Sequence, residues 1–335
     1  MKCTNKLYKI ITIILLASIL CGCGQSTIWM PFSDYTKTIR STNGRSNIIE
    51  HSDYDDRTPG FSAKLCVFSG DVSYNDYSTI SSTASLLIDA RKQKVIYSNN
   101  AFEQRYPASL TKLMTAYVAV KYLSLDTIIN CTQSVETIDV PGAVLLGLHE
   151  GDYFTLDQAL HLCLLSSYND VAIAIAEAVS GTVEDFSLLM NEEALKLGCT
   201  QTHFIDPSGL SSGDHYTSGY DLYLIFNAVI SNPDILEVMQ CKEYTTMIHS
   251  KNGAEREASS VNTNRFFHGM FSVPSNITVV GGKTGTTDEA GHCLIMLVKD
   301  TSSNPYIALV LGANSTEDLY NEMSQMLNLC EITSN

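Results

Sequence analysis

Residues 107–115 read Pro-Ala-Ser-Leu-Thr-Lys-Leu-Met-Thr, and the fold and chemistry of the chain are best approached from this stretch. A proline, a small residue and a serine in front of an apolar run predict a sharp turn that leads into a helix. Ser109 and Lys112 are three residues apart, so on a helix they lie one turn apart on the same side. The buried face of that helix is expected to consist of Leu113, Met114, Tyr117, Val118, Val120 and Tyr122.

The pair of Ser109 and Lys112 suggests nucleophilic catalysis. A serine hydroxyl is a weak nucleophile at neutral pH and needs a base within hydrogen-bonding distance. Lys112 can be that base if burial or a nearby positive charge lowers its pKa toward neutrality. Alone the pair is weak evidence, because a Ser-x-x-Lys sequence is expected about once by chance in such a chain. The alternative is a serine near a helix start and a lysine that extends toward solvent.

Length and charge limit the possible functions. The chain has 335 residues, enough for one large domain or two ordinary ones, and 44% of them are hydrophobic. The formal charge of −15 argues against nucleic acid or an anionic surface as the main partner. The cysteines are scattered and form neither a disulfide framework nor a metal-ligand cluster, so we expect no metal and no cofactor.

The N-terminus predicts export. Lys2, Lys6 and Lys9 precede a short apolar run that ends at Leu20-Cys21-Gly22-Cys23, and this run is too short for a permanent membrane span. The ending resembles a bacterial lipobox, with Cys23 as the lipidated residue. The alternative is an ordinary secretory signal. We therefore expect residues 1–22 to be a signal peptide and the protein to lie outside the cytoplasm, anchored by lipid to the outer face of the cell membrane.

The rest of the chain divides into two parts. Residues 23–82 are polar and lack a sustained period, which predicts a tether that is flexible for most of its length. Within it, the short apolar run 61–68 is a candidate for packing on the domain that follows. The globular domain is expected at 83–335, with a strand pair, a helical block and a final sheet. Strands are predicted at 84–89, 95–98, 277–280, 293–298 and 306–311, and helices after Ser109 and at 159–165, 170–180, 182–197 and 217–230. This order favours one α/β unit whose sheet joins both ends of the domain, with a helical lobe inserted.

A polar break between two apolar helices reads Ser166-Ser167-Tyr168-Asn169-Asp170. Side chains at such a break can point into a cleft. Ser167 could relay a proton, and Asn169 could bind a substrate amide or orient Lys112. The structural alternative is that Ser167 or Asn169 caps the following helix, which does not exclude catalysis.

A glycine-rich strand reads Gly281-Gly282-Lys283-Thr284-Gly285-Thr286-Thr287. Its glycines allow close approach of other groups, and Lys283 would place a positive charge in the cleft. A phosphate-binding loop does not fit, because in a Gly-x-x-x-x-Gly-Lys-Ser/Thr frame that ends at Gly282-Lys283 the first glycine would fall on Ile277. A plain surface hairpin is the remaining alternative.

Together, Ser-x-x-Lys, Ser-x-Asn and Lys-Thr-Gly in this order form a signature of penicillin-binding proteins and class A β-lactamases. Residues 82–313 resemble the D-alanyl-D-alanine carboxypeptidases of low molecular weight, also in the segments 84–89, 202–210, 215–222 and 283–291. The resemblance implies an α/β (α+β sandwich) domain of the β-lactamase/transpeptidase-like fold, in which helices flank an antiparallel sheet. It also implies that peptidoglycan stem peptides are the substrates and that β-lactams are covalent inhibitors.

The same resemblance implies roles for individual residues. Ser109 forms the acyl-ester, Lys112 accepts its proton, and Ser167 relays the proton to the leaving D-alanine. The expected substrate-binding residues are Asn169, Lys283, Thr284, Gly285 and Thr286. The oxyanion is expected between the backbone N–H groups of Ser109 and Thr286. One departure from the family is Tyr168, which stands where glycine is usual.

Two rival functions remain open. A class A β-lactamase needs a deacylating glutamate in a Glu-x-x-Leu-Asn context, and none lies between Asn169 and Lys283. A non-catalytic lipoprotein that senses wall peptides or β-lactams is the other rival. The presence of every catalytic position argues against it, and steady release of D-alanine would separate the two.

Overall fold

The computed structural model describes residues 65–73, 81–210 and 213–332. The predicted signal peptide, Cys23 and most of the predicted tether lie outside these residues. Within the described ranges, no single helix is long and apolar enough to cross a membrane. Two consecutive helices, α6 (Gly219–Ile230) and α7 (Pro233–Gln240), reach that length and apolarity only together, and they are bent by 100°.

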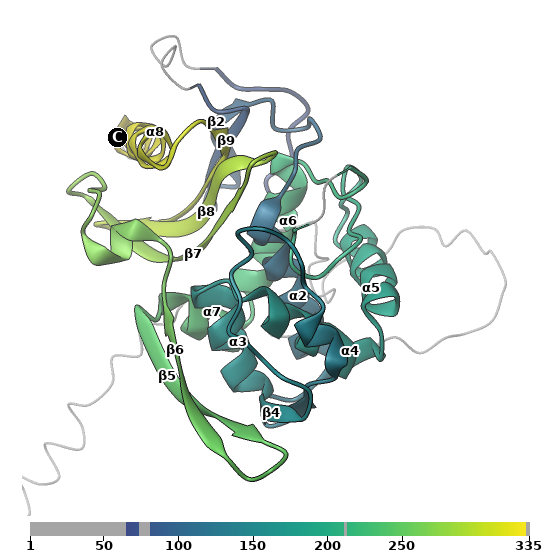
Figure 1. Ribbon diagram of the computed structural model, residues 1–335. Helices are drawn as coiled ribbons and strands as arrows, with labels where there is room; N and C mark the ends of the chain where they lie inside the picture. Colours follow the sequence, from purple (N-terminus) through teal and green to yellow (C-terminus); the bar gives the residue numbers. More distant parts are fainter. Residues whose placement is uncertain (1–64, 74–80, 211–212, 333–335) are drawn as a thin grey trace, which may run out of the picture. The chain divides into compact units, whose positions relative to one another are not determined.

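A five-stranded antiparallel sheet joins the two ends of the domain, as the sequence predicts (Figure 1). Its strand order is β2-β1-β9-β8-β7. The strands are β1 (Ala84–Asp89), β2 (Lys94–Asn99), β7 (Ile277–Thr287), β8 (Gly291–Asp300) and β9 (Pro305–Ala313). Because β7 lies at one edge, one of its sides remains available to the groups that form the site.

Helices cover both faces of this sheet. Alternate residues of its strands point to opposite faces, so Leu86 packs with the helical lobe while Leu87 packs with α8 (Thr316–Leu327). The short helix α9 (Leu329–Ile332) follows α8. The lobe contains α2 (Thr111–Tyr122), α3 (Leu156–Leu165), α4 (Asn169–Ser180), α5 (Val183–Lys196), α6 and α7. Its core is continuous with one face of the sheet, which fixes the lobe against β7 and β8.

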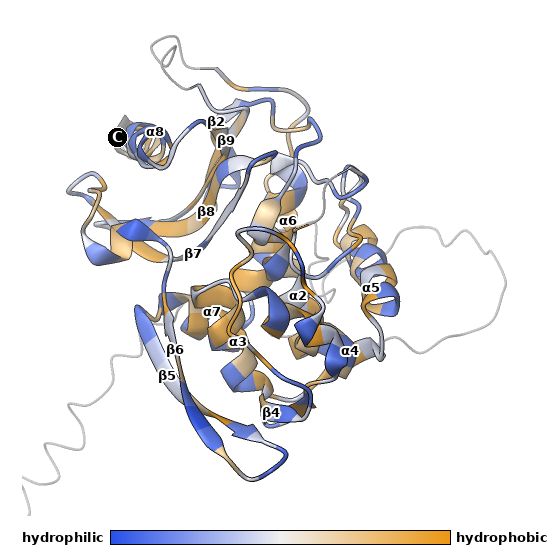
Figure 2. Cartoon of the chain, in the orientation of Figure 1, coloured by the Kyte–Doolittle hydropathy of each residue, from blue (hydrophilic) through white to orange (hydrophobic). Residues whose placement is uncertain are grey.

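A second, four-stranded sheet borders the lobe and was not predicted. Its order is β3-β4-β5-β6, with β3 (Ile128–Asn130), β4 (Asp152–Thr155), β5 (Glu243–Ser250) and β6 (Glu255–Val261). Figure 2 shows that β5 and β6 are largely hydrophilic, whereas β8 and β9 are hydrophobic. With so few buried apolar residues, the period-2 signal of β5 and β6 was too weak to read from the sequence.

The predicted buried face of α2 is wrong at one position. Leu113, Met114 and Val118 are buried, but Tyr122 is 47% exposed. Its hydroxyl donates to Glu193 Oε1 at 3.0 Å. A fully buried carboxylate needs donors, so Tyr122 serves Glu193 at the surface instead of filling the core.

Part of the predicted tether packs on the domain. Leu65 and Cys66 are buried, and the Cys66 N–H donates to Tyr223 Oη at 2.8 Å. Phe68 meets the rings of Phe102 and Tyr220 at centroid distances of 5.0 and 5.3 Å. Residues 65–73 therefore belong structurally to the domain.

Candidate active site

Ser109 lies in a single 3₁₀ turn, Ala108–Leu110, that leads directly into α2. Ala108, just before the serine, has a φ of +48°. For a residue with a Cβ this left-handed conformation costs about 1 kcal/mol, so its surroundings must hold it. The turn is thus a constrained element that presents a half-buried serine at the start of a buried helix.

Lys112 is fully buried and its Nζ has three oxygen neighbours. They are Ser109 Oγ at 3.0 Å, Asn169 Oδ1 at 2.7 Å and the Ser208 carbonyl oxygen at 2.7 Å. The last two are pure acceptors. In a neutral amine they take its two N–H groups, which leaves the nitrogen lone pair for the Ser109 hydroxyl proton. The sequence identified Lys112 and Asn169, but the Ser208 contact uses a backbone oxygen, which side-chain patterns do not reveal.

Burial is the main reason why Lys112 can be neutral. It lowers the Lys112 pKa from 10.5 to about 8, while Cys163, Asp206 and Asp170 act in the opposite direction. The sequence prediction also invoked positive charge from Lys283. The repulsion between the two lysines instead lowers the pKa of Lys283. Burial is the larger cause and the charge of Lys112 the second, and together they lower that pKa to about 7.

The second motif brings two side chains to this group. Ser167 has a φ of +65°, and its buried Oγ has no hydrogen-bond partner among the described residues. Asn169 is 3% exposed, and its Nδ2 donates to the Val144 carbonyl at 3.0 Å. Neither residue is the helix cap, since α4 begins at Asn169 after Tyr168. The amide of Asn169 is thus occupied by Lys112 and Val144, which favours orienting Lys112 over binding a substrate amide.

Tyr168 connects the second motif to the four-stranded sheet. Its hydroxyl donates to the Ser259 carbonyl at 2.9 Å. Ser166 Oγ accepts from the Val261 N–H at 2.9 Å on the same strand. The bulky ring that replaces the expected glycine therefore anchors this loop to β6.

Strand β7 approaches the serine turn closely at Gly285. A Cβ at this position would lie 2.9 Å from Ser109 N and 3.1 Å from Ala108 Cβ. Lys283, on the same strand, is 1% exposed, and its Nζ donates to the Thr284 carbonyl at 2.9 Å. Glycine at 285 is therefore required for β7 to lie against the nucleophile.

These elements enclose a cleft of about 540 Å³. It is lined by Ser109, Ser167, Thr284, Gly285 and Thr286 among the predicted residues. Among the described residues, no aspartate or glutamate lines it, although the chain carries a formal charge of −15. Its basic lining residues are Arg265, His268 and His292, which the motifs did not identify.

The structure therefore brings seven predicted residues of the three motifs to one cleft and its floor: Ser109, Lys112, Ser167, Asn169, Thr284, Gly285 and Thr286. Lys283 lies on the same strand and is coupled electrostatically to Lys112. Cys23 lies outside the described residues.

Comparison with known sequences identifies D-alanyl-D-alanine peptidases as similar proteins. The family model for D-alanyl-D-alanine carboxypeptidases matches residues 71–315. The carboxypeptidase DacF of Bacillus subtilis is 30% identical over 251 residues, which cover 73% of this chain and 61% of DacF. A D-alanyl-D-alanine endopeptidase of Pseudomonas aeruginosa is 32% identical over 218 residues, covering 65% of this chain and 67% of the relative.

A solved structure supports the same fold. The crystal structure of a Streptomyces DD-transpeptidase superposes with a TM-score of 0.70 at 26% sequence identity. The match covers 76% of this chain and 98% of the transpeptidase. The predicted β-lactamase/transpeptidase-like fold is thereby confirmed. The match to DacF spans less than two thirds of that relative's length.

Proposed function

Because the chain belongs to the family of D-alanyl-D-alanine carboxypeptidases, we propose that it removes the terminal D-alanine from peptidoglycan stem pentapeptides. The observation that carries this proposal is the 3.0 Å contact between Lys112 Nζ and Ser109 Oγ. It joins a hydroxyl to an amine whose pKa burial lowers to about 8. This pairing is what activation of a serine requires.

The proposed reaction begins with acylation. Ser109 Oγ attacks the carbonyl between the two D-alanines while its proton moves to Lys112 Nζ. The tetrahedral oxyanion lies between the N–H groups of Ser109 and Thr286, where fixed donors stabilise the developing charge. The proton then passes through Ser167 to the leaving nitrogen, and free D-alanine departs. Water hydrolyses the Ser109 ester and restores the hydroxyl.

We propose that the cleft recognises the substrate mainly through the terminal carboxylate of the peptide. Thr284 and Thr286 line the cleft, and the basic side chains together with the missing acids favour an anionic ligand. A substrate carboxylate near Lys283 would raise the pKa of that amine and keep it charged. A charged Lys283 in turn favours neutral Lys112, so substrate binding would set the base in its working state.

The decisive experiment compares wild type with Ser109→Ala. Wild type is expected to release D-alanine from a defined pentapeptide over many turnovers and to be labelled by fluorescent penicillin. Ser109→Ala should lose both. Ser302→Ala, an exposed position in a β-turn, is the control. Labelling that persists in Ser109→Ala would place the nucleophile elsewhere.

The same assay separates the rival functions. A class A β-lactamase would hydrolyse penicillin steadily, whereas the segment between Asn169 and Lys283 lacks the Glu-x-x-Leu-Asn sequence of its deacylating glutamate, so penicillin is expected to remain on Ser109. A sensor would be labelled by penicillin but would release no D-alanine. Only the proposed enzyme combines stable labelling with continued release of D-alanine.

We also propose that the protein is exported and anchored through lipid at Cys23. This proposal is supported by the basic and apolar start of the chain and by the lipobox-like sequence. Cys23→Ala is expected to release the protein in soluble form, while Cys21→Ala, two residues away, should leave it attached to membranes. Membrane attachment of Cys23→Ala would require a different anchor.

A further inference from the structure

We infer that His215 is a positioning residue for acylation, which acts through Thr111 on the turn that carries Ser109. This inference rests on the proposed acylation of Ser109. His215 and Thr111 are both fully buried. His215 lies outside the three motifs, and Thr111 occupies a variable position of Ser-x-x-Lys. They lie beside the loop that contributes the Ser208 carbonyl to Lys112.

The turn needs external support because Ala108 is held at a φ of +48°. Thr111 Oγ1 donates its hydrogen to the Ala108 carbonyl at 2.8 Å. Gly209 lies against the same carbonyl, since a Cβ there would be 1.8 Å from the Ala108 oxygen. The Thr111 backbone N–H also donates to this carbonyl. The orientation of the peptide just before Ser109 is thus held by the hydroxyl and N–H of Thr111 and by the close packing of Gly209.

The direction of each hydrogen bond follows from this arrangement. Thr111 has a single hydroxyl hydrogen, which the Ala108 carbonyl takes. Its oxygen must therefore accept from His215 Nε2, which lies 2.9 Å away. On the other side of the ring, the Ile205 N–H donates to Nδ1 at 3.2 Å. Both contacts require neutral His215 with its hydrogen on Nε2.

The protein favours this neutral form. Burial lowers the His215 pKa, and His203 and Lys112 act in the same direction, whereas Asp206 opposes them. The Asp206 carboxylate oxygen Oδ2 lies 3.5 Å from Nδ1. At Nε2 the neutral ring therefore donates a hydrogen bond to Thr111 and cannot accept one from it.

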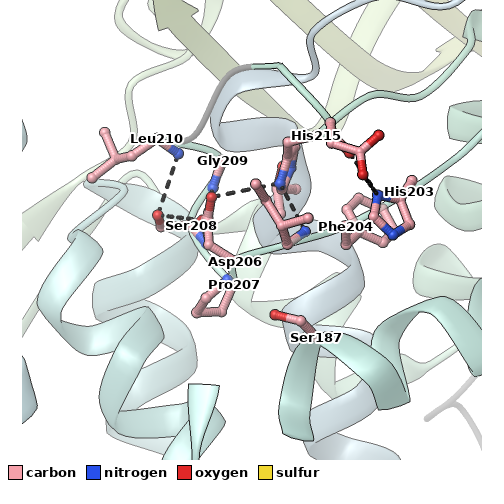
Figure 3. Close-up of polar contacts among 12 residues, drawn as sticks. Ser187, His203, Phe204, Asp206, Pro207, Ser208, Gly209, Leu210 and His215 are labelled. Carbon is pink, nitrogen blue, oxygen red and sulfur yellow. Dashed lines mark hydrogen bonds and ion pairs between the residues drawn. The ribbon is translucent and has the colours of Figure 1, made fainter. Parts of the chain in front are cut away.

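Asp206 connects the histidine to the loop that holds the base (Figure 3). Its Oδ1 accepts from the Ser208 N–H at 2.6 Å, Ser208 Oγ at 2.7 Å and the Gly209 N–H at 2.7 Å. That loop presents the Ser208 carbonyl to Lys112 and places Gly209 against Ala108. His215 thus contacts both Thr111, which holds the turn that carries Ser109, and Asp206, which holds the loop that binds Lys112.

The test measures acylation by a chromogenic cephalosporin in single-turnover experiments on the full chain. Thr111→Val keeps the shape of the side chain but removes its hydrogen bonds to Ala108 and His215. We expect the acylation rate constant to fall about 10- to 100-fold. The dissociation constant of the non-covalent complex should change less than about threefold. Thr111→Ser, which keeps the hydroxyl, should restore most of the rate.

A double-mutant cycle tests whether the two residues act in one chain. His215→Leu should slow acylation like Thr111→Val, and the double variant should be no slower than the worse single variant. His215→Gln supplies one donor and one acceptor, so it should recover part of the rate. A merely structural role would lower thermal stability without this recovery.

The failures can be told apart. If wild type itself forms no acyl-enzyme, the proposed function falls, and this inference falls with it. If wild type is acylated and Thr111→Val matches it, or if the two effects multiply, only the inference is overturned. Thr111→Val is nearly isosteric, so it carries the test even where His215→Leu fails to fold.

Discussion

Lys112 combines two properties that rarely occur together, since it lies in the protein interior and it bonds to a nucleophile. An ammonium ion loses favourable hydration when buried, and three oxygen neighbours only partly replace that water. Desolvation therefore outweighs the carboxylates of Asp206 and Asp170, and the pKa falls. The sequence motif identified the residue and left two possible causes of a lowered pKa, burial and a nearby positive charge. The complete burial of Lys112 identifies the first as the main cause.

The first prediction concerns pH. Lys112 must be neutral to accept a proton, and its pKa is lowered to about 8. The acylation rate constant should therefore rise about tenfold per pH unit at acidic pH and level off above that pKa. Because Lys112 and Lys283 are coupled, the fitted pKa values belong to the pair. Stopped-flow acylation from about pH 6 to about pH 9 measures this profile, and a flat profile would contradict the assignment of a lysine base.

At the scale of elements, sequence prediction succeeded where local chemistry marks the ends. The helices predicted at 182–197 and 217–230 are α5 and α6, which begin after the side-chain caps Thr182 and Ser218. The helix predicted at 159–165 is α3, which begins three residues earlier, after the capping box of Thr155 and Gln158. Sequence prediction missed α7, which begins two residues after the end of α6 and has Asn232 as its cap. The positive φ of Ala108 was not predicted either, because Gly209, which packs against the Ala108 carbonyl, comes from a distant part of the sequence.

The second prediction tests the approach of β7 to the serine turn. In Gly285→Ala, the new methyl group would lie 2.9 Å from Ser109 N, so the strand or the turn must shift. We expect acylation to slow by about 100-fold, because small displacements of catalytic groups cost rate steeply. Gly70→Ala is the control, since a Cβ there has no neighbour within 4 Å. Equal penicillin labelling rates for both variants would show that this close contact is unimportant.

At the scale of the whole molecule, distant parts of the sequence hold one another in place. Strand β1 pairs with β9, so the beginning and the end of the domain share one sheet. Residues 65–73 extend this arrangement, because the Asp71 carboxylate accepts from the N–H groups of Asn100 and Ala101. Those contacts secure the segment that leads to Pro107 and Ser109. Of this packing, the sequence indicated only the short apolar run 61–68, because the residues on either side of it are polar.

The third prediction follows from that packing. A chain beginning at residue 74 loses the buried Leu65 and Cys66 and the ring contacts of Phe68. Its free energy of unfolding should fall by about 3–5 kcal/mol, as for removal of a large buried side chain. A chain beginning at residue 61 keeps these contacts and should unfold like the chain from residue 23. Thermal denaturation of all three chains measures this. If the chains from residues 61 and 74 melt at the same temperature, residues 65–73 contribute nothing to stability. If the chain from residue 61 is already less stable than the chain from residue 23, stabilising contacts lie further toward the N-terminus.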